Sequence, residues 1–272
     1  MTKNTIIIGV LVLLLIEVLV APVDAHALWV ESKDVADVGN SQKVYSFYGH
    51  VSSSAGMSVP LIDTAYLITP NGQKLDLVMK KGDWLPGFGW AEHLNSDIAL
   101  YWPGDYVFVV ARSPSVYDPG WAGTVPSNPR LGYSYAKMVI HAGNETNGNW
   151  SAMVPIDIIP ETAPYEIKVN ENITFSVEYQ GAPVNATYSA YYWTWDAHAG
   201  GQVQTGSTGD QGKFTVNFAQ AGPWQISAYV DVPQQGIWTA TYNHSGGRFK
   251  VGDEVPYNTT RYSMVMSLWV RS

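Results

Sequence analysis

Histidines carry most of the metal-binding capacity of this sequence. The chain has six histidines and no cysteine, so imidazole nitrogen rather than thiolate is the expected ligand for a transition metal. The missing thiols exclude disulfides, thiolate metal sites and cysteine nucleophiles. Taken singly, each histidine can equally be a surface residue or a hydrogen-bonded core residue. Four fall before residue 160, in the first of the two modules expected below, and are the candidate ligands, namely His26, His50, His93 and His141.

The first 25 residues predict a signal peptide and give His26 a special position. Lys3 supplies a positive charge, residues 6–20 are almost wholly apolar, and small residues lead up to Ala25, as signal peptidase requires. The apolar run is short for a membrane span, although an uncleaved N-terminal anchor is the alternative. Cleavage after Ala25 makes His26 the first residue. The sequence therefore predicts a secreted, periplasmic or cell-surface protein, or a membrane-anchored one if the signal is retained.

A histidine at a processed N-terminus joins two nitrogen ligands on one residue. The free α-amine has a pKa of about 7.7 to 8.0 and the imidazole one of about 6.5, so a metal can displace the proton from both near neutral pH. Nitrogen chelates of this kind suit Ni(II) and Cu(II). We expect His26 to bind a transition metal together with imidazoles from His50, His93 or His141, if folding brings them together.

Composition excludes several other classes of function. The net charge is −8 with only 15 Lys and Arg, which is unsuited to nucleic acid. The chain has no Gly-x-Ser-x-Gly elbow, His-Glu-x-x-His helix or phosphate-binding loop, so we do not expect an enzyme.

Sequons that can carry N-glycans on an exported protein begin at Asn144, Asn149, Asn172, Asn185, Asn243 and Asn258.

The rest of the sequence predicts an all-β fold. Short alternating runs broken by Gly, Pro, Asn and Asp show no sustained helical period. Thr69-Pro70-Asn71-Gly72 predicts a hairpin turn, and residues 81–89 and 113–130 predict long loops. The expected strands are 27–31, 43–51, 65–69, 74–79, 104–111, 133–141, 172–179, 185–195, 202–207, 213–218, 224–230 and 264–270.

Two modules are expected after the signal peptide. Pro160-Glu-Thr-Ala-Pro164 separates two strand-rich regions. We therefore predict a signal peptide at 1–25, an N-terminal metal-binding β-sandwich at 26–160, and a C-terminal immunoglobulin-like or transthyretin-like β-sandwich at 161–272.

Several motifs resemble one known family. They are His26-Ala-Leu-Trp-Val-Glu31, Gly49-His50, Tyr135-Ala-Lys137, Gly181-Ala-Pro-Val184, Gly209-Asp-Gln-Gly-Lys-Phe214 and Ala221-Gly-Pro-Trp224. Together they resemble the extracytoplasmic component of cobalt and nickel transport systems. The resemblance implies a protein that captures Ni(II) or Co(II) and passes it to a membrane transporter, with His26 and the Gly49-His50 pair as the matching positions. His93 and His141 are not part of that family pattern.

Two alternatives remain open. An N-terminal histidine on a β-sandwich also resembles copper enzymes that oxidise polysaccharides, and Cu(II) fits the same nitrogen ligands. The wealth of Trp and Tyr also suits a surface adhesion or carbohydrate-binding protein in which the histidines are incidental.

Overall fold

The computed structural model describes residues 26–49, 58–59, 61–85, 89–123, 125–194 and 203–272. These residues form twenty strands and one short 3₁₀ helix, so the predicted all-β sandwich fold is confirmed. Within the described ranges, no helix is long and apolar enough to cross a bilayer.

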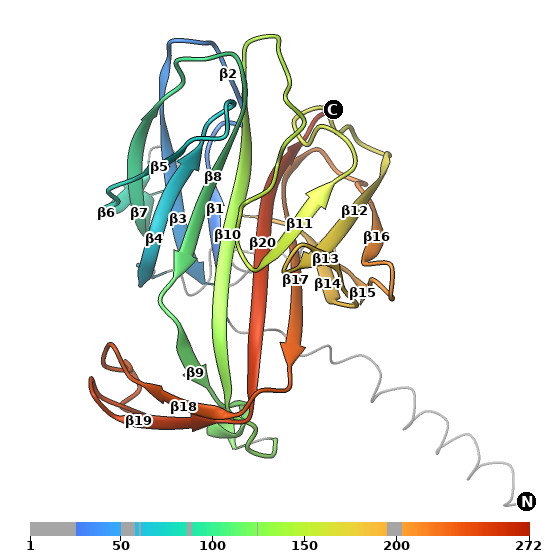
Figure 1. Ribbon diagram of the computed structural model, residues 1–272. Coiled ribbons are helices and arrows are strands. Elements are labelled where there is room, and N and C mark those ends of the chain that lie inside the picture. Colours follow the sequence, from blue (N-terminus) through green and yellow to red (C-terminus); the bar gives the residue numbers. More distant parts are fainter. Residues whose placement is uncertain (1–25, 50–57, 60, 86–88, 124, 195–202) are drawn as a thin grey trace, which may run out of the picture.

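A ten-stranded sheet runs through the middle of the molecule and joins the two halves of the sequence. Its long strands β10 and β20 lie side by side and parallel, with Arg130 paired to Thr259 and Met138 to Ser267 (Figure 1). The order is β15-β14-β17-β20-β10-β8-β4-β5, and β2 and β9 also pair with β10. The bounds are β2 Val35–Ala36, β4 Ile62–Ile68, β5 Lys74–Asp76, β8 Gly104–Arg112, β9 Ser115–Tyr117, β10 Arg130–Ala142, β14 Thr187–Tyr192, β15 Val203–Ser207, β17 Gly222–Val232 and β20 Thr259–Val270.

A four-stranded sheet covers one face of the central sheet on the N-terminal side. Its order is β1-β3-β7-β6, with β1 Ala27–Glu31, β3 Ser41–Gly49, β7 Gly89–Ala99 and β6 Lys80–Leu85. Leu28 and Val30 of β1 pack with Tyr106, Phe108 and Val110 of β8. Alternate residues of β8 point to opposite faces of the sheet, and both faces are covered. This is why the strand is apolar at nearly every position.

A third sheet covers the opposite face on the C-terminal side. It contains β11 Ile156–Pro160, β12 Asn172–Tyr179, β13 Ala182–Pro183 and β16 Lys213–Asn217. Val107 and Val109 of β8, together with Met264 and Met266 of β20, pack against its core residue Phe175. Two sandwiches thus share one continuous sheet and lie on its opposite faces.

Strands from both sides of the expected boundary near residue 160 pair with one another. Strand β11, which lies in the first of the two expected modules, pairs with β12 of the second. The two halves are therefore joined both by the β10–β20 ladder and by the pairing of β11 with β12. The physical reason is that β10 and β20 each present an unsatisfied backbone edge, and pairing satisfies both.

A small unit projects from one end of the central sheet. It comprises β9, the 3₁₀ helix η1 Pro119–Ala122, and the hairpin β18 Gly236–Thr239 with β19 Glu254–Tyr257 (Figure 1). The hairpin is inserted between β17 and β20, and its own core contains Trp238, Tyr242 and Phe249, whose rings are in mutual contact.

The local turn predictions have two outcomes. The hairpin at Thr69 to Gly72 is confirmed, because β4 and β5 pair antiparallel and Gly72 has a φ of +80°. The loop expected at residues 81–89 is wrong over most of its length, since β6 occupies Lys80–Leu85. This edge strand is largely exposed, so its Lys-Lys-Gly-Asp sequence shows none of the alternation that marks a half-buried strand.

Candidate functional site

The start of β1 lies beside the end of β3. The two strands pair antiparallel, and Ala27 is opposite Gly49. His26 immediately precedes this pair; it is exposed, and its ring meets the Tyr48 ring edge-on at 5.6 Å between centroids. His50, which follows Gly49 in the sequence, lies outside the described residues. The register therefore places His26 at the end of the sheet where β3 ends.

His93 is a buried residue of β7 rather than an open ligand. Its Nδ1 lies 2.7 Å from the Ala91 carbonyl oxygen, and because that oxygen can only accept, Nδ1 carries the proton. The ring also contacts Tyr45 and Phe47. Its Nε2 edge lies against the backbone of Gly82, where an added Cβ would be only 2.3 Å away. The absence of a side chain at Gly82 makes room for the imidazole.

His93 and His26 lie on opposite faces of the same sheet. His93 contacts Phe47, whereas His26 contacts Tyr48. Consecutive strand residues point to opposite faces, and the core assignments agree, since Phe47 and Tyr48 belong to different clusters. His93 is therefore not brought to the N-terminal residue.

His141 belongs to a polar network at the end of β10. Its Nδ1 lies 2.8 Å from Asp105 Oδ1, and its ring stacks on Tyr165 with centroids 4.2 Å apart. Asp105 also accepts from Thr146 Oγ1 and Trp150 Nε1. Burial acts to raise the pKa of Asp105, but the hydrogen bonds from His141, Thr146 and Trp150 outweigh it, so the pKa is lowered. The carboxylate stays ionised and fixes the imidazole.

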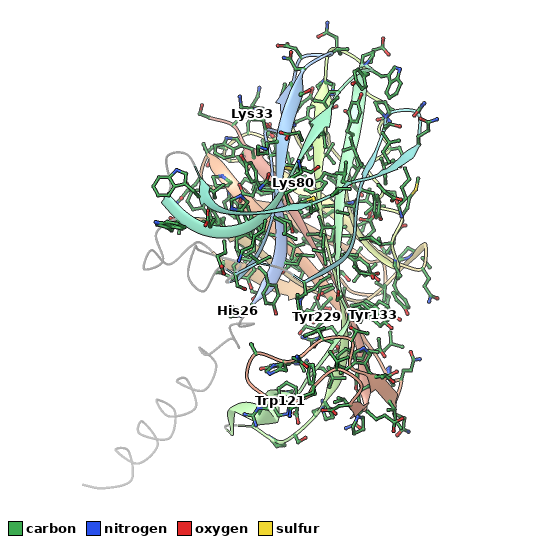
Figure 2. The ribbon with its side chains drawn as sticks, turned by 90° about the vertical axis from the view of Figure 1, so that its left-hand side faces the viewer. His26, Lys33, Lys80, Trp121, Tyr133 and Tyr229 are labelled. Carbon is green, nitrogen blue, oxygen red and sulfur yellow. The ribbon has the colours of Figure 1, made fainter. Side chains whose placement is uncertain are left out.

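This network is remote from His26. The backbone N–H of His141 donates to the carbonyl of Asp34, beyond the far end of β1. Figure 2 shows His26 and Lys33 at opposite ends of that strand. Within the described ranges, no three His, Asp or Glu side chains gather in a way that could hold a metal. His93 and His141 thus supply no ligand to a site at His26, and the N-terminal end of β1 remains the candidate.

A positively charged cluster next to His26 was not anticipated from the sequence. The Arg112 guanidinium lies 4.6 Å from the centroid of the Tyr48 ring, which also contacts His26. Burial, followed by the charges of Arg248 and Arg112, lowers the pKa of His244. Arg112 Nε is buried with no hydrogen-bond partner in the described part of the chain. The sequence does not reveal this cluster, because His244 and Arg248 lie on the hairpin inserted between β17 and β20, far from Arg112 in the chain.

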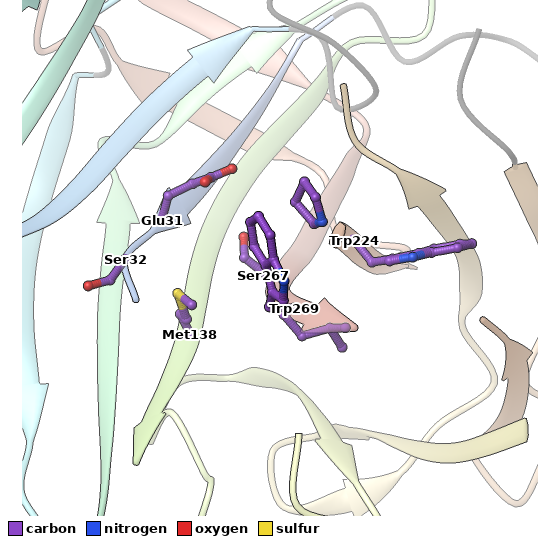
Figure 3. Close-up of a pocket in the computed structure, with 8 residues that line it drawn as sticks. Glu31, Ser32, Met138, Trp224, Ser267 and Trp269 are labelled. Carbon is purple, nitrogen blue, oxygen red and sulfur yellow. The ribbon is translucent and has the colours of Figure 1, made fainter. Parts of the chain in front are cut away.

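A second polar feature lies at the other end of β1. Burial raises the pKa of Glu31 from 4.5 to about 7, and a hydrogen bond with the Trp29 side chain opposes the rise. The carboxyl borders a cavity of about 10 Å³, the space of one water molecule. Figure 3 shows it between β1 and the central sheet, lined by Glu31, Ser32, Met138, Pro223, Trp224, Ser267, Leu268 and Trp269. A cavity of this size holds no organic ligand.

Comparison with known proteins identifies a family. The model of a domain of unknown function, DUF4198, matches residues 23–232. The chain belongs to this family. The DUF4198 match includes both covering sheets and ends with β17, so the β18–β19 hairpin and β20 lie beyond it. A family of unknown function assigns no ligand to its members.

Other comparisons add no functional assignment. No curated protein matches the DUF4198 chain. Among solved structures, it is similar to a mutant alpha-2-macroglobulin from Salmonella, with 12% sequence identity and a TM-score of 0.23. That similarity covers 91% of this chain and only 15% of the macroglobulin, and so low a score supports no argument about fold or function.

Proposed function

We propose that this protein, after cleavage behind Ala25, binds a divalent transition metal outside the cytoplasm and delivers it to a membrane transporter. The ligands are the α-amine and imidazole of His26 and the imidazole of His50. The observation that supports the proposal is the pairing of Ala27 with Gly49. His26 precedes Ala27 and His50 follows Gly49 in the sequence. One further pair in the same register would make them direct partners, and such partners in an antiparallel ladder have Cβ atoms about 4.5–5.5 Å apart.

The chemistry of the site follows from its ligands. Three nitrogens favour Ni(II), Co(II) or Cu(II), and the affinity order among these metals favours copper. His26 is exposed, which suits a carrier that must release its ion to a partner. Arg112, which also contacts the Tyr48 ring, adds positive charge, so a metal accompanied by an anionic ligand is favoured over the bare cation.

Calorimetric titration of the processed protein with Ni(II), Co(II) and Cu(II) tests the proposal. The N-terminus is first established by mass spectrometry. We expect a single tight site that weakens at least tenfold in His26→Ala. A second variant with one glycine added before His26 keeps the imidazole but displaces the amine, and should weaken binding similarly. His141→Ala, at a histidine remote from His26, is the matched control and should bind like the parent. Undiminished binding by His26→Ala would refute the proposal.

A second candidate function, carbohydrate binding at the cell surface, is favoured by one surface feature. Trp84 and Trp90 are 57% and 77% exposed and meet edge-on, 6.0 Å between centroids. Exposed aromatic rings of this kind stack on sugar rings, and contiguous apolar patches commonly mark binding sites. Glycan-array binding that is lost in Trp90→Ala, by a protein that binds none of the three metals, would support this function over metal capture.

A further inference from the structure

Lys137 and Asp157 form a contact that is unusual for its burial. The Lys137 side chain on β10 is fully buried, and its Nζ lies 2.5 Å from Oδ1 of Asp157 on β11. Asp157 is also buried. The two strands belong to different sheets, so this contact ties the central sheet to the sheet that covers its C-terminal side.

The surroundings hold the two groups in a fixed orientation. Lys137 Nζ also donates to the Trp150 carbonyl, at 2.7 Å. Asp157 Oδ2 accepts from the Ala152 N–H at 2.7 Å, and Oδ1 from the Ile158 N–H at 2.9 Å. Two backbone donors thus withdraw electron density from the carboxyl group, in the way that such donors stabilise the oxyanion formed when a nucleophile attacks.

Burial also favours the reactive form of the lysine. Removal from water lowers the pKa of Lys137, opposed by the charge of Asp157 and, more weakly, of Glu178. A desolvated lysine amine is a competent nucleophile. Two buried charges carry a large desolvation cost even when they are paired, and converting them to a neutral amide removes that cost.

We propose that Lys137 and Asp157 condense to form an intramolecular isopeptide bond. A proton first passes from the Lys137 ammonium to the Asp157 carboxylate, with which it is in contact. The neutral Nζ then attacks Cγ, the N–C bond forms, and one C–O bond breaks as that oxygen leaves as water. An ammonium and a carboxylate give one amide and one water, so two of the three ammonium protons leave with the oxygen and the third stays on the amide nitrogen. No oxidant, metal or external acid is consumed.

The bond would serve a chain that has no cysteine. The cross-link closes a segment of twenty residues between β10 and β11 and reduces the freedom of the unfolded chain. It occupies the place that a disulfide often takes in exported β-sandwiches. Because the linked strands lie in different sheets, the bond would also hold the covering sheet on the central one.

Digestion with trypsin distinguishes the amide from an ordinary ion pair. Cleavage is expected after Arg130 and Lys168, and an acylated Lys137 is not cut. Protein made in a host that adds no N-glycans should yield peptide 131–168 intact and 18 Da lighter than its sequence. Fragmentation should place the loss between Lys137 and Asp157, which separates the cross-link from a succinimide of equal mass. Separate peptides 131–137 and 138–168 of full mass would overturn the proposal.

Two variants keep the test decisive. Lys137→Arg removes the nucleophile and retains the charge, so the 18 Da loss should disappear from the intact mass. If that variant does not fold, Asp157→Asn serves instead, because its amide can be attacked in the same way with loss of ammonia. The expected loss is then 17 Da, and a folded Asp157→Asn protein of full mass would contradict the mechanism.

Discussion

Glu31 makes a measurable prediction about stability and pH. Its folded-state pKa of about 7 lies above the 4.5 of an unperturbed carboxyl, so between these values the native state binds more protons than the unfolded chain. The free energy of unfolding must therefore fall as pH rises through this window. A difference of this size corresponds to about 3 kcal/mol at pH 8, from about 1.4 kcal/mol per pKa unit.

The substitution Glu31→Gln isolates this effect. Glutamine cannot ionise and keeps an oxygen that accepts the Trp29 hydrogen bond. The free energy of unfolding of the variant should therefore equal that of the parent or lie below it at pH 4. At pH 8 it should exceed that of the parent by up to about 3 kcal/mol. Urea unfolding of both proteins at five pH values between 4 and 8 measures the difference. Glu161→Gln, at an exposed ion pair with Lys213, is the control and should show almost none. A variant-minus-parent difference that is flat with pH refutes the reasoning.

Three further substitutions test packing and exposure. Gly82→Ala places a methyl group 2.3 Å from His93 Nε2 and should destabilise by about 1–3 kcal/mol; urea midpoints should show partial recovery when His93→Ala is added. Tyr66→Phe removes the 2.7 Å hydrogen bond to the buried Ala152 carbonyl and should cost about 1–2 kcal/mol, so an unchanged melting temperature would contradict the role of that bond. Trp90→Ala, at a residue that is 77% exposed, should change the free energy of unfolding by less than about 0.5 kcal/mol in the same chemical denaturation.

The sequence predicted the local elements better than their pairing. Alternation of apolar residues located most strands, and Pro-Asn-Gly located the β4–β5 hairpin. The parallel pairing of β10 with β20 was not predictable, because the two strands are separated by more than a hundred residues and their periodicity carries no information about partner. The same limit applies to β11, whose partner β12 follows it in the chain after the expected boundary.

The histidines show the same limit at single residues. The types of residue suggested a metal site, but register decides which side chains can meet. His93 and His26 are separated because Phe47 and Tyr48 face opposite ways, and no property of the isolated histidines reveals this. The burial of Lys137 did carry a local signal. This lysine occupies the same phase of the strand as Tyr135 and Val139, where an apolar residue is expected.

The continuous central sheet explains how distant segments meet at the N-terminal end of β1. Strand β20 returns the chain to the side of β10 after the inserted hairpin, so that hairpin is fixed to the same sheet end as β9. Arg112 leaves β8 at this end and reaches both Tyr48 of the covering sheet and Tyr242 of the hairpin. A ligand at His26 would therefore be felt by groups from three separate stretches of sequence. Since those stretches are held by one hydrogen-bonded sheet, the charge around the N-terminal residue is set by the fold rather than by the first strand alone.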